Sequence, residues 1–380
     1  MSMVMSWVIW CLALAGSAAL YLFAPNGWVL ALGAMVLLLP FLSFPGVWLV
    51  RRHLYASLEL PETMEKKREA GLNVKLRNDC RFSAPCVQLV LRLENRLTGE
   101  SGVRKLTFSV AANSTVSETI PFLPEYCGAL SAELEKLCVR DVFRFWSAFR
   151  ICGERQESLI VPNTFEPQLL LPMPSLSVSE SEQYSQSAPG YDYAEVFQVR
   201  DYAEGDSPKQ IHWKLSTKLD RMIVRDPSLP LDRWVLLIWE RGNRAETAAQ
   251  SDAMAETLVS VCHGLIRRNV GCRVVWMEEG LDGCTELTLR EEQELYDALP
   301  KLLRAGKTEE RVLTRYLQLF GAEKQNPVIV LTTEDDPLLT ELCPEAHLTV
   351  LLCGAGTAPG RVYPFSAENL CEALGELNLT

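Results

Sequence analysis

The segment from residue 190 to residue 226 carries the densest group of side chains that could do chemistry. His212 is a candidate general base, but no nucleophile accompanies it at the spacing of a catalytic pair. The charged side chains of both signs can also form internal ion pairs and caps, or a surface for a partner protein. We expect internal pairs first, a partner surface next and catalysis last. The candidate residues are Arg200, Tyr202, Gly205, Asp206, His212, Trp213, Lys214 and Arg225.

Strand and helix signals predict how this segment is held. A strand over residues 195–199 and a second over residues 222–225 flank a turn and a helix. Ser207 followed by Pro208 forms an N-cap and a first helical position, so we expect a short helix over residues 208–218. Trp213 then lies on this helix, where it either packs into a core or anchors a partner protein.

Two soluble domains flank this segment. Residues 54–162 contain short alternating or apolar runs at regular spacing, which predict an antiparallel β-sandwich. Residues 163–189 are rich in Pro, Ser and Gln and are predicted to be a linker. Residues 227–380 alternate strands with helices, which predicts a mainly parallel, doubly wound α/β domain.

Residues 1–53 are expected to form a transmembrane hairpin. No Asp, Glu, Lys or Arg occurs before Arg51, and apolar runs over residues 4–23 and 28–50 each reach the roughly 20 residues that cross a bilayer. A secretory signal peptide is the alternative, but no basic residue precedes the first run and a second run of spanning length follows. Because the two apolar runs lack charged residues, we expect an anchor and not a transport path.

Positive charge after the second run sets the expected orientation. Arg51 and Arg52 follow it directly, and Lys66, Lys67 and Arg68 come soon after. Positive residues favour the cytoplasmic side of a membrane. We therefore expect a multi-pass protein of the cell inner (plasma) membrane, with cytoplasmic soluble domains and with the lipid bilayer as one partner.

Net charge and cysteine spacing argue against two classes of function. The formal net charge is −11, so we do not expect binding of nucleic acid through a basic surface. The 12 cysteines are scattered without a CxxC pair, which indicates free thiols of a reducing compartment and neither a disulfide framework nor zinc ligands. No cofactor is expected.

The segment of residues 190–226 resembles the signature of the domain of unknown function 58 family, a bacterial group. The matching residues are Arg200-Asp201-Tyr202, Glu204-Gly205-Asp206, Ile211-His212-Trp213-Lys214 and Val224-Arg225-Asp226. The resemblance implies paired N-terminal spans, a β-rich domain and a von Willebrand factor A-like domain after the signature. It implies no established activity, and by association it implies a MoxR-type AAA ATPase as a cytoplasmic partner.

The resemblance also indicates where a divalent cation could bind. Von Willebrand factor A domains place a DxSxS loop after their first strand, and its carboxylate and hydroxyl oxygens suit Mg²⁺. Here residues 239–244 read Trp-Glu-Arg-Gly-Asn-Arg, so the hydroxyls are absent and two arginines bring positive charge to the site. We expect no metal, and the weak candidates for ligands are Glu240, Asp335 and Asp336.

These observations lead to one hypothesis and two alternatives. We expect a non-enzymatic, membrane-anchored scaffold: a transmembrane hairpin, then an antiparallel β-sandwich, then a doubly wound α/β domain that resembles a degenerate von Willebrand factor A domain. Its soluble domains would present surfaces to a protein partner. The alternatives are a divalent-cation-dependent binding module and an enzyme of unrecognised chemistry.

Overall fold

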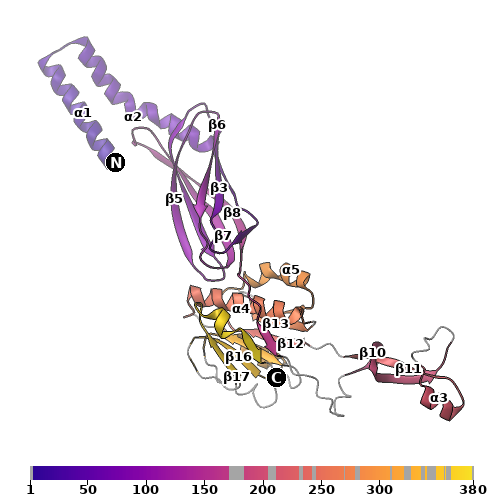
Figure 1. Ribbon diagram of the computed structural model, residues 1–380. Coiled ribbons are helices and arrows are strands. Elements are labelled where there is room, and N and C mark those ends of the chain that lie inside the picture. The colour runs from indigo at the N-terminus through magenta and orange to yellow at the C-terminus, as the bar shows by residue number, and fades with distance from the viewer. Residues whose placement is uncertain are drawn as a thin grey trace.

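The helix pair, the sandwich and the α/β sheet follow one another in space as they do in the chain (Figure 1). The predicted fold class, two N-terminal apolar helices, a β-sandwich and an α/β domain, is confirmed. For residues 184–198, 225–230 and 320, the structure describes the backbone alone. The computed structural model describes residues 3–170, 184–203, 211–230, 234–241, 245–268, 270–278, 283–308, 310–320, 327–334, 339, 348–354, 356 and 361–378.

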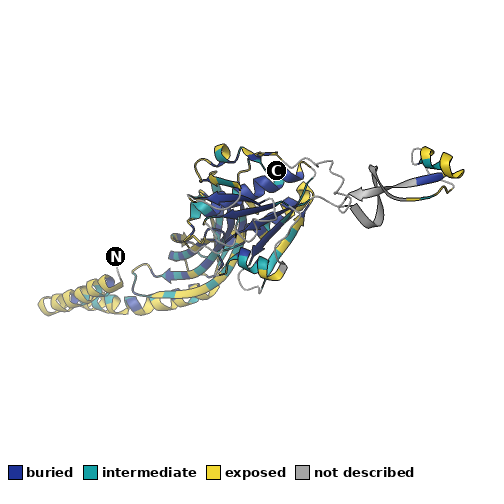
Figure 2. Ribbon diagram, turned by 90° about the horizontal axis from the view of Figure 1, so that it is seen from below, coloured by how far each residue is buried: buried dark blue, intermediate teal, exposed yellow. Residues whose placement is uncertain are grey.

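The two N-terminal helices, α1 (Met3–Phe23) and α2 (Gly27–His53), pack antiparallel and are each long and apolar enough to cross a membrane. Most of their side chains are exposed (Figure 2). Pro40 has no N–H to give to the carbonyl of Val36, four residues earlier. Trp10 supplies the missing donor, because its Nε1 lies 2.7 Å from the Val36 oxygen. In lipid, where no water can reach that carbonyl, such a bond makes the proline tolerable.

The sandwich consists of two sheets packed face to face. Every second residue of β3 from Leu72 to Leu76 is fully buried, whereas the residues between them are partly exposed, as a sheet with one face on a core requires. α2 continues without a break into β1, so its Val47 and Val50 join the sandwich core. One sheet has the order β1 (Leu54–Glu59), β3 (Ala70–Asn78), β6 (Ser114–Phe122), and the other β2 (Thr63–Glu65), β8 (Ser147–Val161), β7 (Gly128–Arg140), β4 (Ala84–Asn95), β5 (Ser101–Val110).

The α/β domain is a doubly wound sheet of mixed but mainly parallel strands. By rank along the chain its strand order is 3-2-1-4-5-6, and the edge strand β14 alone runs antiparallel to its neighbour. α4 (Ala248–Ile266) and α5 (Glu292–Leu302) cover one face, and α6 (Val312–Phe320) covers the other. The strands are β14 (Cys284–Leu289), β13 (Gly271–Met277), β12 (Trp234–Trp239), β15 (Val328–Thr332), β16 (Leu348–Cys353) and β17 (Arg361–Phe365).

Part of the predicted linker belongs to the α/β domain. β9 (Gln168–Leu170) pairs in parallel with β18 (Glu376–Asn378) at the end of the chain. Leu169 is only 5% exposed and lies in the core under α4. The C-terminal residues form the short α8 (Leu370–Ala373) before β18. The linker prediction was wrong for residues 168–170 because two short segments about 200 residues apart become strands only by pairing with each other.

Candidate functional site

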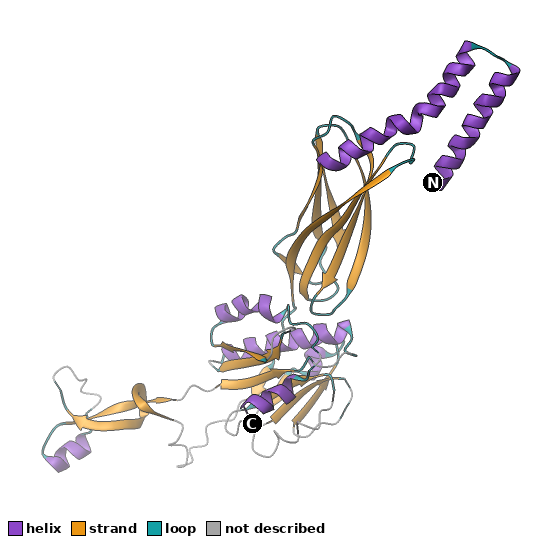
Figure 3. Ribbon diagram, turned by 180° about the vertical axis from the view of Figure 1, so that it is seen from behind, coloured by secondary structure: helices purple, strands orange, loops and turns teal. Residues whose placement is uncertain are grey.

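The segment with the candidate residues forms an arm outside the two domains. We call β10 (Tyr184–Asp201), α3 (Trp213–Leu219) and β11 (Ile223–Pro230) the arm. β10 and β11 pair antiparallel, with Arg200 opposite Val224. The arm stands away from the α/β sheet and carries α3 at its outer end (Figures 1 and 3).

His212 is the N-cap of α3. Its ring Nδ1 accepts a hydrogen bond from the Leu215 backbone N–H at 3.3 Å, and the backbone N–H of His212 donates to the Ile223 carbonyl at 2.8 Å. The helix therefore begins at Trp213, five residues later than predicted, because Ile211 bridges to Val224 as a strand residue instead. An imidazole that caps a helix has a structural role.

The middle of α3 is also bonded to β11. The Ser216 hydroxyl donates to the His212 carbonyl at 3.1 Å and accepts from the Ile223 N–H at 3.0 Å. Asp220 follows in the left-handed conformation with φ 51°, and its N–H bonds to the Ser216 carbonyl. Arg221 pairs with Asp201 at 3.3 Å, but both side chains are exposed, so this pair adds little stability.

Large apolar side chains remain exposed on this fastened helix and beside it. We call Tyr202, Trp213, Leu219 and Met222 the arm tip; their exposed fractions are 40%, 63%, 46% and 53%. Lys214 is also exposed on α3. A rigid, exposed tryptophan is the kind of residue that anchors a protein interface.

Three candidate residues of the arm are described only in part or not at all. Gly205 and Asp206 lie outside the described residues. Arg225 lies in β11 opposite Val199, but its side chain is not among those described. The side chains of the arm that can be described are therefore those of Arg200, Tyr202 and the residues of α3 and its caps.

Glu240, a weak candidate metal ligand, has another role. It follows β12 at the point where the strand order reverses, which is where open α/β sheets bind ligands. Both of its carboxylate oxygens accept backbone N–H groups at the start of α6, from Val312 at 3.1 Å and from Leu313 at 3.0 Å. A carboxylate there satisfies two free N–H groups and the positive end of the helix dipole.

The other metal candidates, Asp335 and Asp336, lie outside the described residues. Within the part of the chain that the structure describes, no three His, Cys, Asp or Glu side chains come together as metal ligands would. Glu240 itself is engaged by the start of α6.

Arg241, the next residue, joins the α/β domain to the sandwich. Its side chain is fully buried, with Nη1 2.8 Å from Glu246 Oε1 and Nη2 donating to the Leu97 carbonyl at 2.6 Å. Leu97 belongs to the loop between β4 and β5, so the end of the sandwich covers the carboxyl end of β12. Burial lowers the pKa of Arg241, and the attraction of Glu246 opposes this change. Arg241 is one of the two arginines after β12 that were expected to disfavour a divalent cation, and its side chain is buried there.

A second buried group of charges lies at the same junction. Lys66 Nζ binds Glu256 at 2.7 Å and also binds Asp252 on α4. Asp252 in turn accepts the Cys127 N–H at 2.7 Å. Burial alone would lower the pKa of Lys66, but its hydrogen bonds to the two carboxylates outweigh burial and raise it.

This position corrects one step of the orientation argument. Lys66 lies between β2 and β3, at the end of the sandwich that meets the α/β domain. The chain leaves α2 along the whole of β1 before it reaches this turn, about 20 Å at the rise of a strand. Lys66 is therefore not a charge at the membrane surface, whereas Arg51 and Arg52 lie in the last turn of α2. Its neighbours in the sequence gave no sign that it would be buried.

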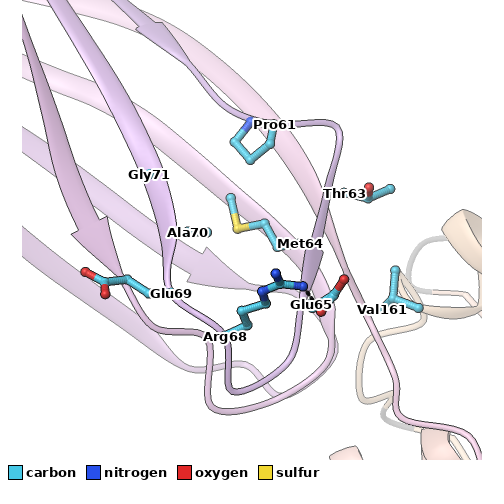
Figure 4. Close-up of a pocket in the computed structure, with 9 residues that line it drawn as sticks. All are labelled: Pro61, Thr63, Met64, Glu65, Arg68, Glu69, Ala70, Gly71 and Val161. Atoms are coloured by element: carbon cyan, nitrogen blue, oxygen red, sulfur yellow. Dashed lines mark hydrogen bonds and ion pairs between the residues drawn. The ribbon is translucent and has the colours of Figure 1, made fainter.

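A pocket of about 610 Å³ opens beside β2 on the sandwich (Figure 4). Its central charged residues, Arg68 and Glu65, point toward each other at 2.8 Å and are 74% and 68% exposed. Binding sites normally combine apolar walls with buried, convergent polar groups. This pocket offers solvated charges that already pair with each other, so we do not assign it a ligand.

Comparisons with known proteins assign no family: no protein-family model matches the chain, and none of the curated proteins matches it. The chain is similar to the solved CARDB domain of a Pyrococcus furiosus protein, with a TM-score of 0.21 and 13% identity over 28% of this chain and 87% of that one. It is also similar to a cohesin module from a Clostridium perfringens family 33 glycoside hydrolase, with a TM-score of 0.22 and 7% identity over 28% of this chain and 96% of that one. Such values transfer no function.

Proposed function

We propose that this chain is a membrane-anchored, non-enzymatic scaffold whose arm tip binds a partner protein. The observation that carries the proposal is Trp213, which is 63% exposed on a helix capped by His212 at its start and fastened through Ser216 in its middle. A helix held in this way loses little conformational entropy on binding, so its exposed aromatic ring can contribute most of its contact energy to affinity.

The anchoring part of the proposal is supported by the two apolar helices. Their exposed apolar side chains would be unfavourable in water and favourable in lipid. Arg51 and Arg52 at the end of α2 support a cytoplasmic position for the sandwich, the arm and the α/β domain, at the inner (plasma) membrane.

We also propose that the chain belongs with the domain of unknown function 58 family and that its α/β domain is a degenerate von Willebrand factor A domain. The signature residues of the arm and the strand order with an antiparallel edge strand support this. The partner to test first is then a MoxR-type AAA ATPase. α3 carries Lys214 and Lys218 and no acidic residue, so its partner should present an acidic surface next to an apolar pocket.

The test is a cross-linking pull-down of the full chain from native membranes, compared with its Trp213→Ala and Tyr296→Ala variants. Tyr296 on α5 is 57% exposed and is the matched control. An interface tryptophan contributes at least about 2 kcal/mol, so we expect its loss to weaken binding roughly 30-fold. An AAA ATPase should be recovered with the parent and with Tyr296→Ala but not with Trp213→Ala. Equal recovery with both variants, or no ATPase with the parent, would contradict the proposal.

A further inference from the structure

The end of the sandwich next to the helices exposes apolar side chains. The turn between β7 and β8, residues 141–146, carries Val142 and Phe143 with exposed fractions of 71% and 47%. The first residues of β8 continue this surface, with Phe149 at 56% and Ile151 at 73%. Isolated exposed apolar residues are common on soluble proteins, but four of them around one turn need a partner.

The turn is bonded directly to the helix pair. Trp146 Nε1 donates to the Pro40 carbonyl of α2 at 2.8 Å, and Trp7 Nε1 of α1 donates to the Phe145 carbonyl at 3.2 Å. The rings of Trp7 and Trp146 meet edge to face with centroids 5.6 Å apart, and Phe44 packs on Trp146 at 5.2 Å. These contacts fix the level of the turn along the helices.

That level lies within the apolar part of α2. Pro40 precedes His53, the last residue of α2, by 13 positions, which is about 20 Å of helix. The Ser147 hydroxyl, just after the turn, reaches Met3 at the start of α1. The turn is therefore level with the first residue of one apolar helix and the middle of the other, and it lies on the apolar side of Arg51.

We propose that the turn of residues 141–146 dips into the lipid bilayer as a third membrane contact, with Phe149 and Ile151 at the level of the headgroups. This inference rests on the proposed membrane anchoring of α1 and α2. Aromatic residues at this level match the interfacial belt of membrane proteins. Basic side chains accompany them: Lys136 Nζ lies 4.9 Å from the Phe149 ring, and Arg150 lies over Tyr55 at 5.3 Å. Cations beside apolar side chains suit anionic headgroups above acyl chains.

A third contact would orient the soluble part. The bonds of the turn to Trp7 and Pro40 hold the sandwich to the helix pair, and a lipid contact on the sheet opposite β1 would also fix how the sandwich tilts on the membrane. β7 runs 13 residues from the α/β end of the sandwich to the turn, about 40 Å at the rise of a strand. The α/β domain would therefore be held at a set height above the membrane.

The experiment uses the full chain in vesicles of phosphatidylethanolamine and phosphatidylglycerol. The photo-crosslinking residue benzoylphenylalanine replaces Phe143, or Val142 in a second variant, and cross-linked phospholipid is detected by mass spectrometry. Leu38 on α2, 51% exposed, is the site that reports on anchoring, and Val103 near the opposite end of the sandwich, 53% exposed, is the matched control.

We expect phospholipid adducts at positions 38, 142 and 143, and none at position 103. Adducts at position 38 with none at 142 and 143 would overturn the third contact and leave the anchoring intact. Cross-links from 142 and 143 to a second copy or another protein would overturn it as well. No adduct at position 38 would refute the anchoring itself, which distinguishes failure of the proposed function from failure of this inference.

Discussion

Replacing Arg241 with methionine should separate the sandwich from the α/β domain. The Arg241→Met change keeps most of the side-chain volume but removes the guanidinium that binds Glu246 and the Leu97 carbonyl. Glu246 is as fully buried as Arg241 and would be left as an uncompensated charge. Within the described residues, Ser251 is another donor to that carboxylate.

The expected cost follows from burial. Removing one partner of a buried ion pair destabilises a protein by about 3–5 kcal/mol. For a domain of this size that corresponds to a fall in Tm of roughly 6–20 °C. The double variant Arg241→Met with Glu246→Leu removes both charges of this pair and leaves only the Leu97 carbonyl and the Ser251 hydroxyl without their partners, which costs about 1–3 kcal/mol.

The assay is thermal and urea unfolding of the full chain in detergent, together with hydrogen exchange of the β4–β5 loop. Arg267→Met is the control, because its ion pair with Glu166 is 50% and 71% exposed and should contribute less than about 1 kcal/mol. Faster exchange in the loop should accompany the fall in Tm. The reasoning is refuted if Arg241→Met unfolds like the control, or if the double variant is no more stable than the single one.

Three further results are expected. Lys66→Met should destabilise the domain junction. Because the folded-state pKa of Lys66 is raised, the extra free energy of unfolding of the parent should be full below the unfolded-state pKa of about 10.4 and disappear as pH rises further. Urea unfolding at several pH values would show this, and a difference that grows at alkaline pH would contradict it. Trp10→Phe should weaken the helix pair by about 0.6–2 kcal/mol, since it removes the donor to the Val36 carbonyl that Pro40 leaves without its helical N–H. Thermal stability in detergent should fall relative to the control Trp28→Phe, because the Trp28 ring is 83% exposed. Burial raises the pKa of the Cys353 thiol to about 12. Iodoacetamide at about pH 8 should therefore modify the exposed Cys371 long before Cys353. Peptide mass spectrometry can measure both rates, and similar rates would argue against the buried position of Cys353.

Local patterns were enough to predict most elements of this fold. The absence of charge before Arg51 predicts the helix pair, because length and hydropathy are properties of a continuous stretch. Alternation predicts the sandwich, and longer apolar runs separated by helices predict the parallel sheet, for the same reason. The arm was found through its unusual side chains, although its helix begins later than the N-cap at Ser207 suggested.

The roles of single side chains depended on partners far away in the chain. Glu240 resembles a metal ligand by position, yet it caps a helix that begins 72 residues later. Arg241 finds its acceptor at Leu97, 144 residues earlier.

The sequence by itself determined most of the helices and strands and which stretch is apolar enough for lipid. The tertiary structure alone decided which charges are buried as pairs at the domain junction, that the end of the sandwich covers the site after β12, and that the turn of residues 141–146 lies beside the apolar helices. The physical reason is that periodicity is a property of neighbouring residues, whereas a buried charge or carbonyl is stabilised by whichever partner the packing of distant segments brings within hydrogen-bond distance.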